Sequence, residues 1–333
     1  MLTIHGVSQR YASAPDEVLR EVSFAVDRGQ TLVVTGASGS GKSSLLRILA
    51  GLESPSAGEV RWCDAPVLSP DALIPGHPAI AFLDQSSDLP PNLPVAETIK
   101  RELRRYPDAY QTQRLHELLT FCGIAHTQRL PRELSGGEQQ RLALARAVAR
   151  LPEVLLLDEP FAHLDYPNKT RLRQLIQDLA QRFKLTIIVV THQIRDAFGF
   201  ADHLLVLERG RIAQIDSPTT IYNRPATPEI AQLFGPTNLL PLPLLGQDYA
   251  AYPPQTLAYI PPEFISISSR GGKPAQVSAS TYLGGRFLIT ANLLDDQGQV
   301  SQTSLHFFVQ QENLQVGSHV QLQIHLRWLH TFG

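Results

Sequence analysis

Apolar residues fall into short continuous runs over the first 235 residues, and longer stretches of helical periodicity separate these runs. Continuous runs of Val, Ile and Leu are typical of strands that are buried on both faces of a parallel sheet. The expected strands are Thr31–Thr35, Ala79–Leu83, Val154–Leu157, Thr186–Val190 and Leu204–Leu207. The expected helices are Lys42–Ala50, Gln111–Cys122, Gly137–Arg150 and Asn168–Phe183. Two hairpin-type strands, Leu2–Val7 and Glu59–Trp62, predict an antiparallel flank beside this α/β core.

The last part of the chain follows a different pattern, in which single apolar residues alternate with polar ones. A period of two is typical of a half-buried strand. The clearest alternation places apolar side chains at Val320, Leu322, Ile324, Leu326 and Trp328. The other expected strands are Gln276–Tyr282, Arg286–Leu293 and Ser304–Val309, with turns at Gly284-Gly285 and Asp296-Gln297-Gly298. This density of short strands predicts a small all-β barrel over residues 257–333.

A Pro-rich segment over residues 236–256 separates the two parts. Proline removes a backbone donor and fixes φ, so we expect an extended linker there. Composition changes at the same point, because residues 1–235 carry 51 of the 60 charged side chains and residues 236–333 carry 9. The sequence therefore predicts two domains, one over residues 1–235 and one over residues 257–333.

Composition excludes several classes of protein. A formal net charge of −2 supplies no bulk positive field for binding nucleic acid. The two cysteines, Cys63 and Cys122, are too few for a disulfide framework or a zinc site, which favours a reducing compartment. We expect no membrane span, because no apolar run approaches the required length of about 18 residues. The first residues contain no basic-then-apolar leader, so we expect no export.

A glycine-rich loop follows the first expected parallel strand and opens a helix. It fits the GxxxxGK[ST] pattern with Gly36, Ala37, Ser38, Gly39, Ser40, Gly41, Lys42 and Ser43, and Ser44 follows it. Glycines let successive backbone N–H groups point at one phosphate, and the helix start adds partial positive charge. We expect Lys42 to reach the β and γ phosphates of ATP and Ser43 to bind Mg²⁺. The strand–loop–helix setting disfavours a purely structural turn.

Two carboxylates, Asp158 and Glu159, end the apolar strand Val154–Leu157. We expect Asp158 to hold the shell of Mg²⁺ and Glu159 to orient or deprotonate the attacking water. Taken alone, such a pair is usually only the end of a strand. Beside a phosphate-binding loop, the catalytic interpretation is favoured.

The octet Leu134–Arg141, with the sequence LSGGEQQR, resembles the signature of ATP-binding cassette (ABC) ATPases. Ser135, Gly136 and Gly137 lie at a helix start and form a second anion site. The resemblance implies that two chains pair head to tail, with each ATP between one chain's loop and the other's signature. Such a homodimer contact is isologous. The resemblance also implies a P-loop NTPase fold with a RecA-like core, an antiparallel β edge and a helical subdomain over about residues 86–150.

Four further residues match this family in order along the chain. Tyr11 lies where the family stacks an aromatic ring on adenine, and Gln85 resembles the Q-loop glutamine, which senses Mg²⁺ and the transporter subunit. Asp165 ends the segment AHLD, which resembles the D-loop that crosses the dimer interface. His192 resembles the switch histidine that contacts the γ-phosphate.

The chain departs from the usual family pattern at three positions. Asp84 stands where a Phe is common, Ala162 where a Ser is common, and Gln193 where an acidic residue is common. None of these departures removes a catalytic group.

Segments after residue 209 resemble the importer branch of the family. They are Gly210–Pro218, Ile221–Pro228, Phe234–Leu240 and Pro262–Ile267, the last resembling the start of a C-terminal OB-like (TOBE) domain. The resemblance implies an ATP-hydrolysing motor for uptake of ferric iron, a polyamine or an oxyanion. Sugar importers usually have a longer C-terminal region.

The same resemblance implies partners and a location. The partners are two membrane permease subunits or one fused permease, and an extracytoplasmic solute-binding protein. The motor would lie at the cytoplasmic face of a bacterial inner membrane. Residues 86–95 stand where the family contacts the permease's coupling helix.

Two other functions fit the sequence less well. Soluble ABC ATPases of ribosomes or DNA usually carry two cassettes or a coiled-coil insertion, and this chain shows neither. A solute-sensing regulatory ATPase would hydrolyse little, which the intact Asp158, Glu159 and His192 argue against.

The second part of the chain offers two further candidate sites, and both are disfavoured. Residues 236–333 carry four basic residues against five acidic ones, so we expect no nucleic-acid partner. Three histidines, His319, His325 and His330, are better explained as surface residues than as a metal site.

Overall fold

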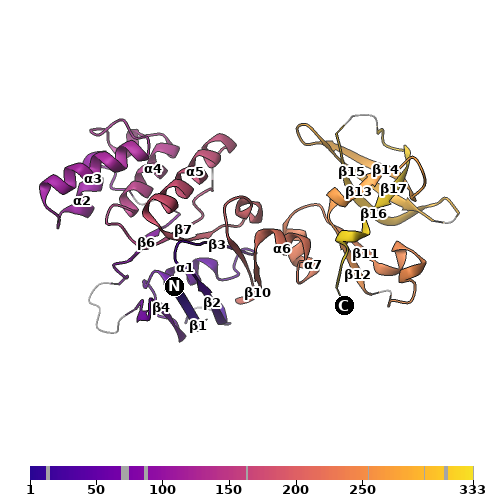
Figure 1. Ribbon diagram of the computed structural model, residues 1–333, viewed down its shortest axis with the longest axis horizontal. Coiled ribbons are helices and arrows are strands. Elements are labelled where there is room, and N and C mark those ends of the chain that lie inside the picture. Colours follow the sequence, from indigo (N-terminus) through magenta and orange to yellow (C-terminus); the bar gives the residue numbers. More distant parts are fainter. Residues whose placement is uncertain are drawn as a thin grey trace. The chain divides into compact units, whose positions relative to one another are not determined.

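Figure 1 shows the chain as a computed structural model that describes residues 1–12, 16–68, 75–85, 89–162, 164–253, 255–295, 297–310 and 314–332. These residues form two compact units, Met1–Pro218 and Thr219–Gly333. The division falls ahead of the predicted linker, because the helical segment before residue 236 groups with the second unit. Its helices are α6 (Pro218–Asn223) and α7 (Pro228–Leu233). Ser86, His163 and Asp296, which entered the sequence expectations, lie outside the described residues.

A six-stranded sheet in the order β10-β9-β3-β8-β7-β6 forms the centre of the first unit. Its strands are β3 (Thr31–Thr35), β6 (Ile80–Leu83), β7 (Val154–Asp158), β8 (Thr186–Val190), β9 (His203–Glu208) and β10 (Arg211–Asp216). All neighbours run parallel except β10, which is antiparallel to β9. Every residue of β3, β7 and β8 is buried. The expected parallel sheet covered on both faces is thereby confirmed.

An antiparallel sheet in the order β2-β1-β4-β5 flanks this core, also as expected. Its strands are β1 (Leu2–Gln9), β2 (Leu19–Val26), β4 (Ala57–Trp62) and β5 (Ala65–Pro66). Helix α1 (Lys42–Leu49) buries its apolar residues in one core with both sheets. That core includes Leu2 and Ile4 of β1 and Leu156 of β7. The start of α1 is therefore held rigidly at the end of β3.

Helices cover the rest of the first unit, and Figure 1 shows α2, α3 and α4 gathered in one group. The helices are α2 (Val95–Leu103), α3 (Asp108–Phe121), α4 (Gly136–Ala147), α5 (Tyr166–Phe183) and the short turns η1 (Pro131–Glu133) and η2 (Ile194–Ala197). Buried Arg114 of α3 donates to the carbonyls of Val148 and Ala149, just past α4. The guanidinium thereby pairs carbonyls that a helix end leaves free. Within the described residues, none of the helices is both long and apolar enough to cross a membrane.

The second unit is all-β apart from α6, α7 and single helical turns, as the alternating pattern predicts. One sheet contains β11 (Asn238–Pro241), β12 (Leu257–Ile260) and β18 (His330–Phe332). The other contains β13 (Ile265–Ile267), β14 (Lys273–Tyr282), β15 (Phe287–Leu294), β16 (Val300–Val309) and β17 (His319–Ile324). A single apolar core joins the two sheets, with Leu240 and Ile260 from one and Val277, Ile289 and Phe307 from the other.

Two expectations for this unit need correction. The strand expected to run to Trp328 ends at Ile324, because the His325 N–H bonds to the Phe264 carbonyl and a 3₁₀ turn follows. The segment expected as an extended linker contains β11 and two 3₁₀ turns, η3 (Leu242–Leu245) and η4 (Gln247–Tyr249). Backbone pairing with β12 outweighs the local stiffness of the prolines.

Asn238 explains why the supposed linker is ordered. Its side chain is fully buried and donates to the carbonyls of Ile260 and His306, at 3.0 and 2.9 Å. Its Oδ1 accepts the His306 N–H at 2.6 Å. One side chain thus joins β11 to both sheets of the unit.

We expect Asn238→Leu to lower the stability of the second unit by about 2–3 kcal/mol, because one buried and two partly buried backbone groups lose their partners. Hydrogen exchange of the β11 and β16 amides measures this loss. The control is Asn292→Leu, since the bond that Asn292 Oδ1 accepts from Ser304 Oγ is exposed. Equal exchange in the two variants would contradict the role of Asn238.

At Gly36 the chain leaves the end of β3 and passes in close contact with the backbone of β9. Its φ is +151°, and a Cβ placed there would lie 2.1 Å from the Leu207 carbonyl oxygen of β9. Gly39 in the same loop has a φ of +79° and open space around the same position. Of these two glycines, Gly36 is required for packing as well as for its backbone angle, and Gly39 for its backbone angle alone.

We expect Gly36→Ala to lower the free energy of unfolding by about 3 kcal/mol or more, from strain plus overlap with β9. Gly39→Ala carries only the left-handed strain of about 1–2 kcal/mol. Urea unfolding of both variants measures the difference. Equal losses would show that β9 can move aside.

Candidate active site

The loop between β3 and α1 wraps around the side chain of Lys42. Gly41 caps α1 with a φ of +101°, and Lys42 is the first residue of the helix. The buried Lys42 Nζ donates to the carbonyls of Gly36 and Ala37, both at 2.9 Å, and lies 3.5 Å from Ser40 Oγ. Burial lowers the pKa of Lys42, and the carboxylates of Glu159 and Asp158 oppose that shift. A cation and the N-terminus of α1 therefore meet at the end of β3.

Carboxylates gather opposite this loop, at the end of β7. Ser43 Oγ lies 3.5 Å from Asp158 Oδ1, at the limit of a hydrogen bond. Burial raises the pKa of Asp158, the Ser43 hydroxyl lowers it, and the neighbouring carboxylates of Asp84 and Glu159 raise it further. Hydroxyl and carboxylate oxygens are the ligands that Mg²⁺ prefers, and a bound cation would offset the repulsion among these carboxylates. The residues present therefore fit Mg²⁺.

Glu159 is aimed at His192 by an unusual backbone conformation. Its φ is +48°, in the left-handed region that non-glycine residues rarely adopt. Its N–H donates to the Val190 carbonyl at 2.9 Å, at the end of β8. Its Oε2 then lies 2.9 Å from His192 Nδ1. Backbone strain of this kind is typical of functional positions.

Gln85 lies on the same wall as the acidic pair. It lines a narrow cavity together with Asp84, Asp158, Glu159 and Gln140. Gln140 comes from α4, and its buried Oε1 has no hydrogen-bond partner in the described residues. Helix α4 and the carboxylates of Asp158 and Glu159 therefore meet at this cavity.

Tyr11 is fixed beside the start of α1. Its hydroxyl lies 2.6 Å from Glu53 Oε2 and 3.0 Å from Ser44 Oγ. Burial raises the pKa of Tyr11, and the hydrogen bond to Glu53 adds to the shift. Glu53 also pairs with Arg47 at 2.8 Å. Glu53 was absent from the sequence expectations, because nothing in its local pattern indicates this contact.

The remaining predicted residues cap helices. Ser135 is the N-cap of α4, and its Oγ accepts the Glu138 N–H at 3.4 Å. In return, Glu138 Oε2 accepts the Ser135 N–H at 2.9 Å. These hydrogen bonds from Ser135 lower the pKa of Glu138. Asp165 is the N-cap of α5 and accepts the Asn168 N–H at 3.0 Å. The structure thus brings Lys42, Ser43, Gln85, Asp158, Glu159 and His192 together, and Ser135–Gly137 and Asp165 begin separate helices.

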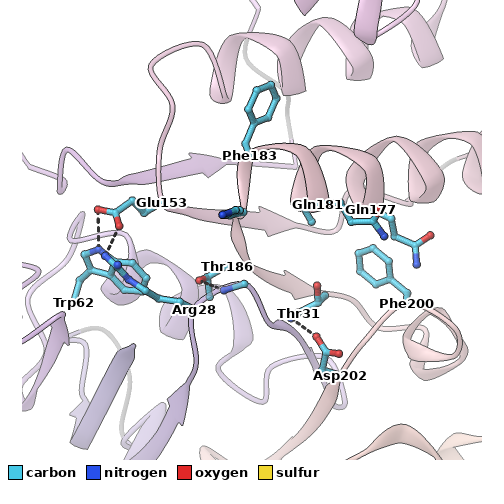
Figure 2. Close-up of a pocket in the computed structure, with 13 residues that line it drawn as sticks. Arg28, Thr31, Trp62, Glu153, Gln177, Gln181, Phe183, Thr186, Phe200 and Asp202 are labelled. Atoms are coloured by element: carbon cyan, nitrogen blue, oxygen red, sulfur yellow. Dashed lines mark hydrogen bonds and ion pairs between the residues drawn. The ribbon is translucent and has the colours of Figure 1, made fainter.

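A cavity of about 680 Å³ lies at the other edge of the parallel sheet (Figure 2). Thr31 and Thr186, which begin β3 and β8, line it. Glu153 forms an ion pair with Arg28 and accepts the Trp62 Nε1–H at 3.4 Å, so these polar groups pair with one another. Ligands of open α/β sheets bind at the carboxyl ends of the strands. The candidate active site is therefore the Lys42–Asp158–His192 region and not this cavity.

Comparison with known proteins agrees with this geometry. The family model described as ABC transporter matches residues 19–162. An Fe(3+) ions import ATP-binding protein of Rhodococcus jostii is 34% identical over 90% of this chain and 90% of its own length. A glucose import ATP-binding protein of Saccharolobus solfataricus is 32% identical over 92% of this chain and 93% of its own.

A solved structure shares the fold of the first unit. It is a dimeric ATP-binding cassette in a post-hydrolysis state, bound to ADP and Pi. It is 28% identical with a TM-score of 0.58, and the match covers 66% of this chain and 99% of that one. The chain therefore belongs to the ABC transporter family, in the branch of importer ATP-binding subunits.

Proposed function

We propose that this chain hydrolyses ATP to power solute import through membrane permease partners. One observation carries the proposal. A buried cation, a hydroxyl–carboxylate pair and a glutamate–histidine pair meet at the ends of β3, β7 and β8, at Lys42, Ser43–Asp158 and Glu159–His192. Phosphoryl transfer needs mainly positioned charges of this kind.

Each group has a distinct task in the proposed reaction. The loop N–H groups and Lys42 bind the β and γ phosphates, and Tyr11 stacks on adenine. Ser43, Asp158 and Gln85 would hold Mg²⁺, which neutralises phosphate charge when it is bound. Glu159 orients the attacking water and accepts its proton at a carboxylate oxygen, and His192 holds the γ-phosphate.

We further propose that the active form is a homodimer. Ser135 and Gly136 are exposed at the start of α4, and Asp165 is exposed at the start of α5. A second copy would place its Ser135–Gly137 against the ATP that is held by the first copy. The dimeric cassette among the solved relatives supports this arrangement.

A basic groove suggests where the permease binds. The groove has a volume of about 600 Å³ and runs between the edge strand β6 and helices α2 and α4. Its lining includes Phe82, Pro90, Arg101, Arg104, Arg146 and Arg150. Among the described lining residues there are four arginines and one carboxylate, Glu102, which pairs with Arg150. We propose that an acidic cytoplasmic segment of the permease docks here, beside residues 89–95, with the motor at the cytoplasmic face of the membrane.

For the solute we propose a set of classes and not a single compound. The relatives include import subunits for ferric iron and for glucose at similar identity, and we propose that the solute is selected elsewhere in the transporter. We propose ferric iron, a polyamine or an oxyanion, delivered by an extracytoplasmic solute-binding protein. ATPase rates in lipid vesicles with the permease and each loaded binding protein test these solutes. No response to any solute would contradict the import function.

We expect Glu159→Gln to bind ATP but to lower kcat by about 10²–10⁴-fold, because the proton acceptor is lost. Lys42→Ala should lose ATP binding. Steady-state ATPase and fluorescent-nucleotide titration measure the two effects. The matched control is Glu153→Gln, in the cavity of Figure 2, which should leave kcat within about twofold. Near-normal kcat in Glu159→Gln would remove Glu159 from the mechanism.

We expect Arg101→Glu with Arg104→Glu to weaken binding of the permease by about 10–100-fold, through lost charge complementarity. ATPase of the isolated chain should not change, because neither residue lies at the active site. Co-purification and titration with permease in nanodiscs measure the binding. Arg171→Glu, on the exposed side of α5, is the control. Equal binding by both variants would place the permease elsewhere.

A further inference from the structure

We propose that Lys169 is a positioning residue for His192 and that it acts through Gln193. The inference rests on the proposed ATPase function and deepens it. It assigns a task to a lysine of α5 that lies outside the phosphate-binding loop, the acidic pair and the signature.

The buried carboxylate of Asp196 anchors Lys169 next to His192 and Gln193. Its side chain is only 4% exposed, and it lies in the turn η2 that follows His192. Lys169 forms an ion pair with it, and Arg173 reaches it at 3.5 Å from the next turn of α5. Thr191 Oγ1 donates to its second oxygen at 3.2 Å. A buried carboxylate with these partners holds the residues around His192 against α5.

Lys169 also makes a hydrogen bond that does not involve Asp196. Its Nζ donates to Gln193 Oε1 at 2.7 Å. Gln193 is exposed, and its backbone N–H donates to Thr191 Oγ1 at 3.1 Å. A lysine ammonium has three donors, so one cation serves the buried carboxylate and the exposed amide together.

Gln193 lies against the histidine of the active site. Its Nε2 is 3.5 Å from His192 Nε2, and His192 Nδ1 is 2.9 Å from Glu159 Oε2. A continuous series of polar contacts thus runs from Lys169 through Gln193 and His192 to Glu159. His192 is itself 53% exposed, so packing alone does not hold its ring. The amide held by Lys169 limits where the ring can lie.

The position of Lys169 explains why this restraint matters. α5 starts at the cap Asp165, and Lys169 N–H donates to the Asp165 carbonyl. Asp165 faces the second copy in the proposed dimer. A shift of α5 on dimer formation would therefore move Gln193 and His192 with it, since Lys169 ties them to the first turns of the helix.

Gln193→Ala is the most informative variant, because it leaves Asp196 and its cations intact. We expect it to lower kcat about tenfold with KM for MgATP within about twofold, as for a misplaced group that acts in the transition state. Gln193→Glu retains the acceptor for Lys169 but loses the amide N–H that faces His192, so its kcat should fall as in Gln193→Ala if the link runs through that amide. Unchanged kcat in Gln193→Ala would overturn the proposal, because a merely structural Lys169 does not need Gln193.

Lys169→Met completes a double-mutant cycle with Gln193→Ala. If both residues act through one link, the double variant should lose little more kcat than Lys169→Met alone, and full additivity would contradict the link. Lys169→Arg should restore most of the activity. Arg171→Met, exposed on the same helix, is the control for loss of a long cation.

Folding and the main proposal are tested separately from this link. Thermal unfolding of each full-length variant identifies any loss of stability, and kcat is taken per correctly folded chain. If wild-type chain lacks ATPase, or if Glu159→Gln keeps it, the proposed function fails. If Glu159→Gln loses ATPase while Gln193→Ala keeps it, only the role of Lys169 fails.

Discussion

Opposite charges are buried together at the carboxyl ends of three parallel strands, and the rest of the first unit is arranged to hold them. Lys42 and Asp158 are both largely withdrawn from water, although desolvation of an ion costs several kcal/mol. The loop carbonyls satisfy the ammonium, and Ser43 approaches the carboxylate. These partners stay in place because β3, β7 and β8 are buried throughout and α1 is packed between two sheets.

Unusual backbone angles occur where this arrangement needs them. Gly36 passes so close to β9 that no side chain fits, which fixes the path of the loop around Lys42. Glu159 adopts a left-handed angle that turns its carboxylate from the end of β7 toward β8. Strain is tolerated at these positions because the surrounding sheet is rigid. The chemistry of the site is thus a property of the whole sheet and not of the motifs alone.

The parallel sheet, its antiparallel flank and the site loop were predictable because their signals are local. Continuous apolar runs mark β3, β7 and β8, and the glycine spacing marks the loop. Contacts between distant residues were not predictable in this way. Arg114 reaches the end of α4 across 35 residues, Lys169 reaches Gln193 across 24, and Asn238 reaches His306 across 68. Local composition also misled at residues 236–256, where prolines suggested a linker and pairing with β12 decided the outcome.

The signature helix shows how one structure serves both stability and function. The first N–H groups of a helix have no partner within it. At α4, Ser135 Oγ takes the N–H of Glu138, and the reciprocal bond from Glu138 completes a capping box. Gly136 and Gly137 precede Glu138 and carry no side chain over their own N–H groups, and a Cβ on Gly136 would meet open space. The cap therefore stabilises the helix and still leaves Ser135 and Gly136 exposed at its start.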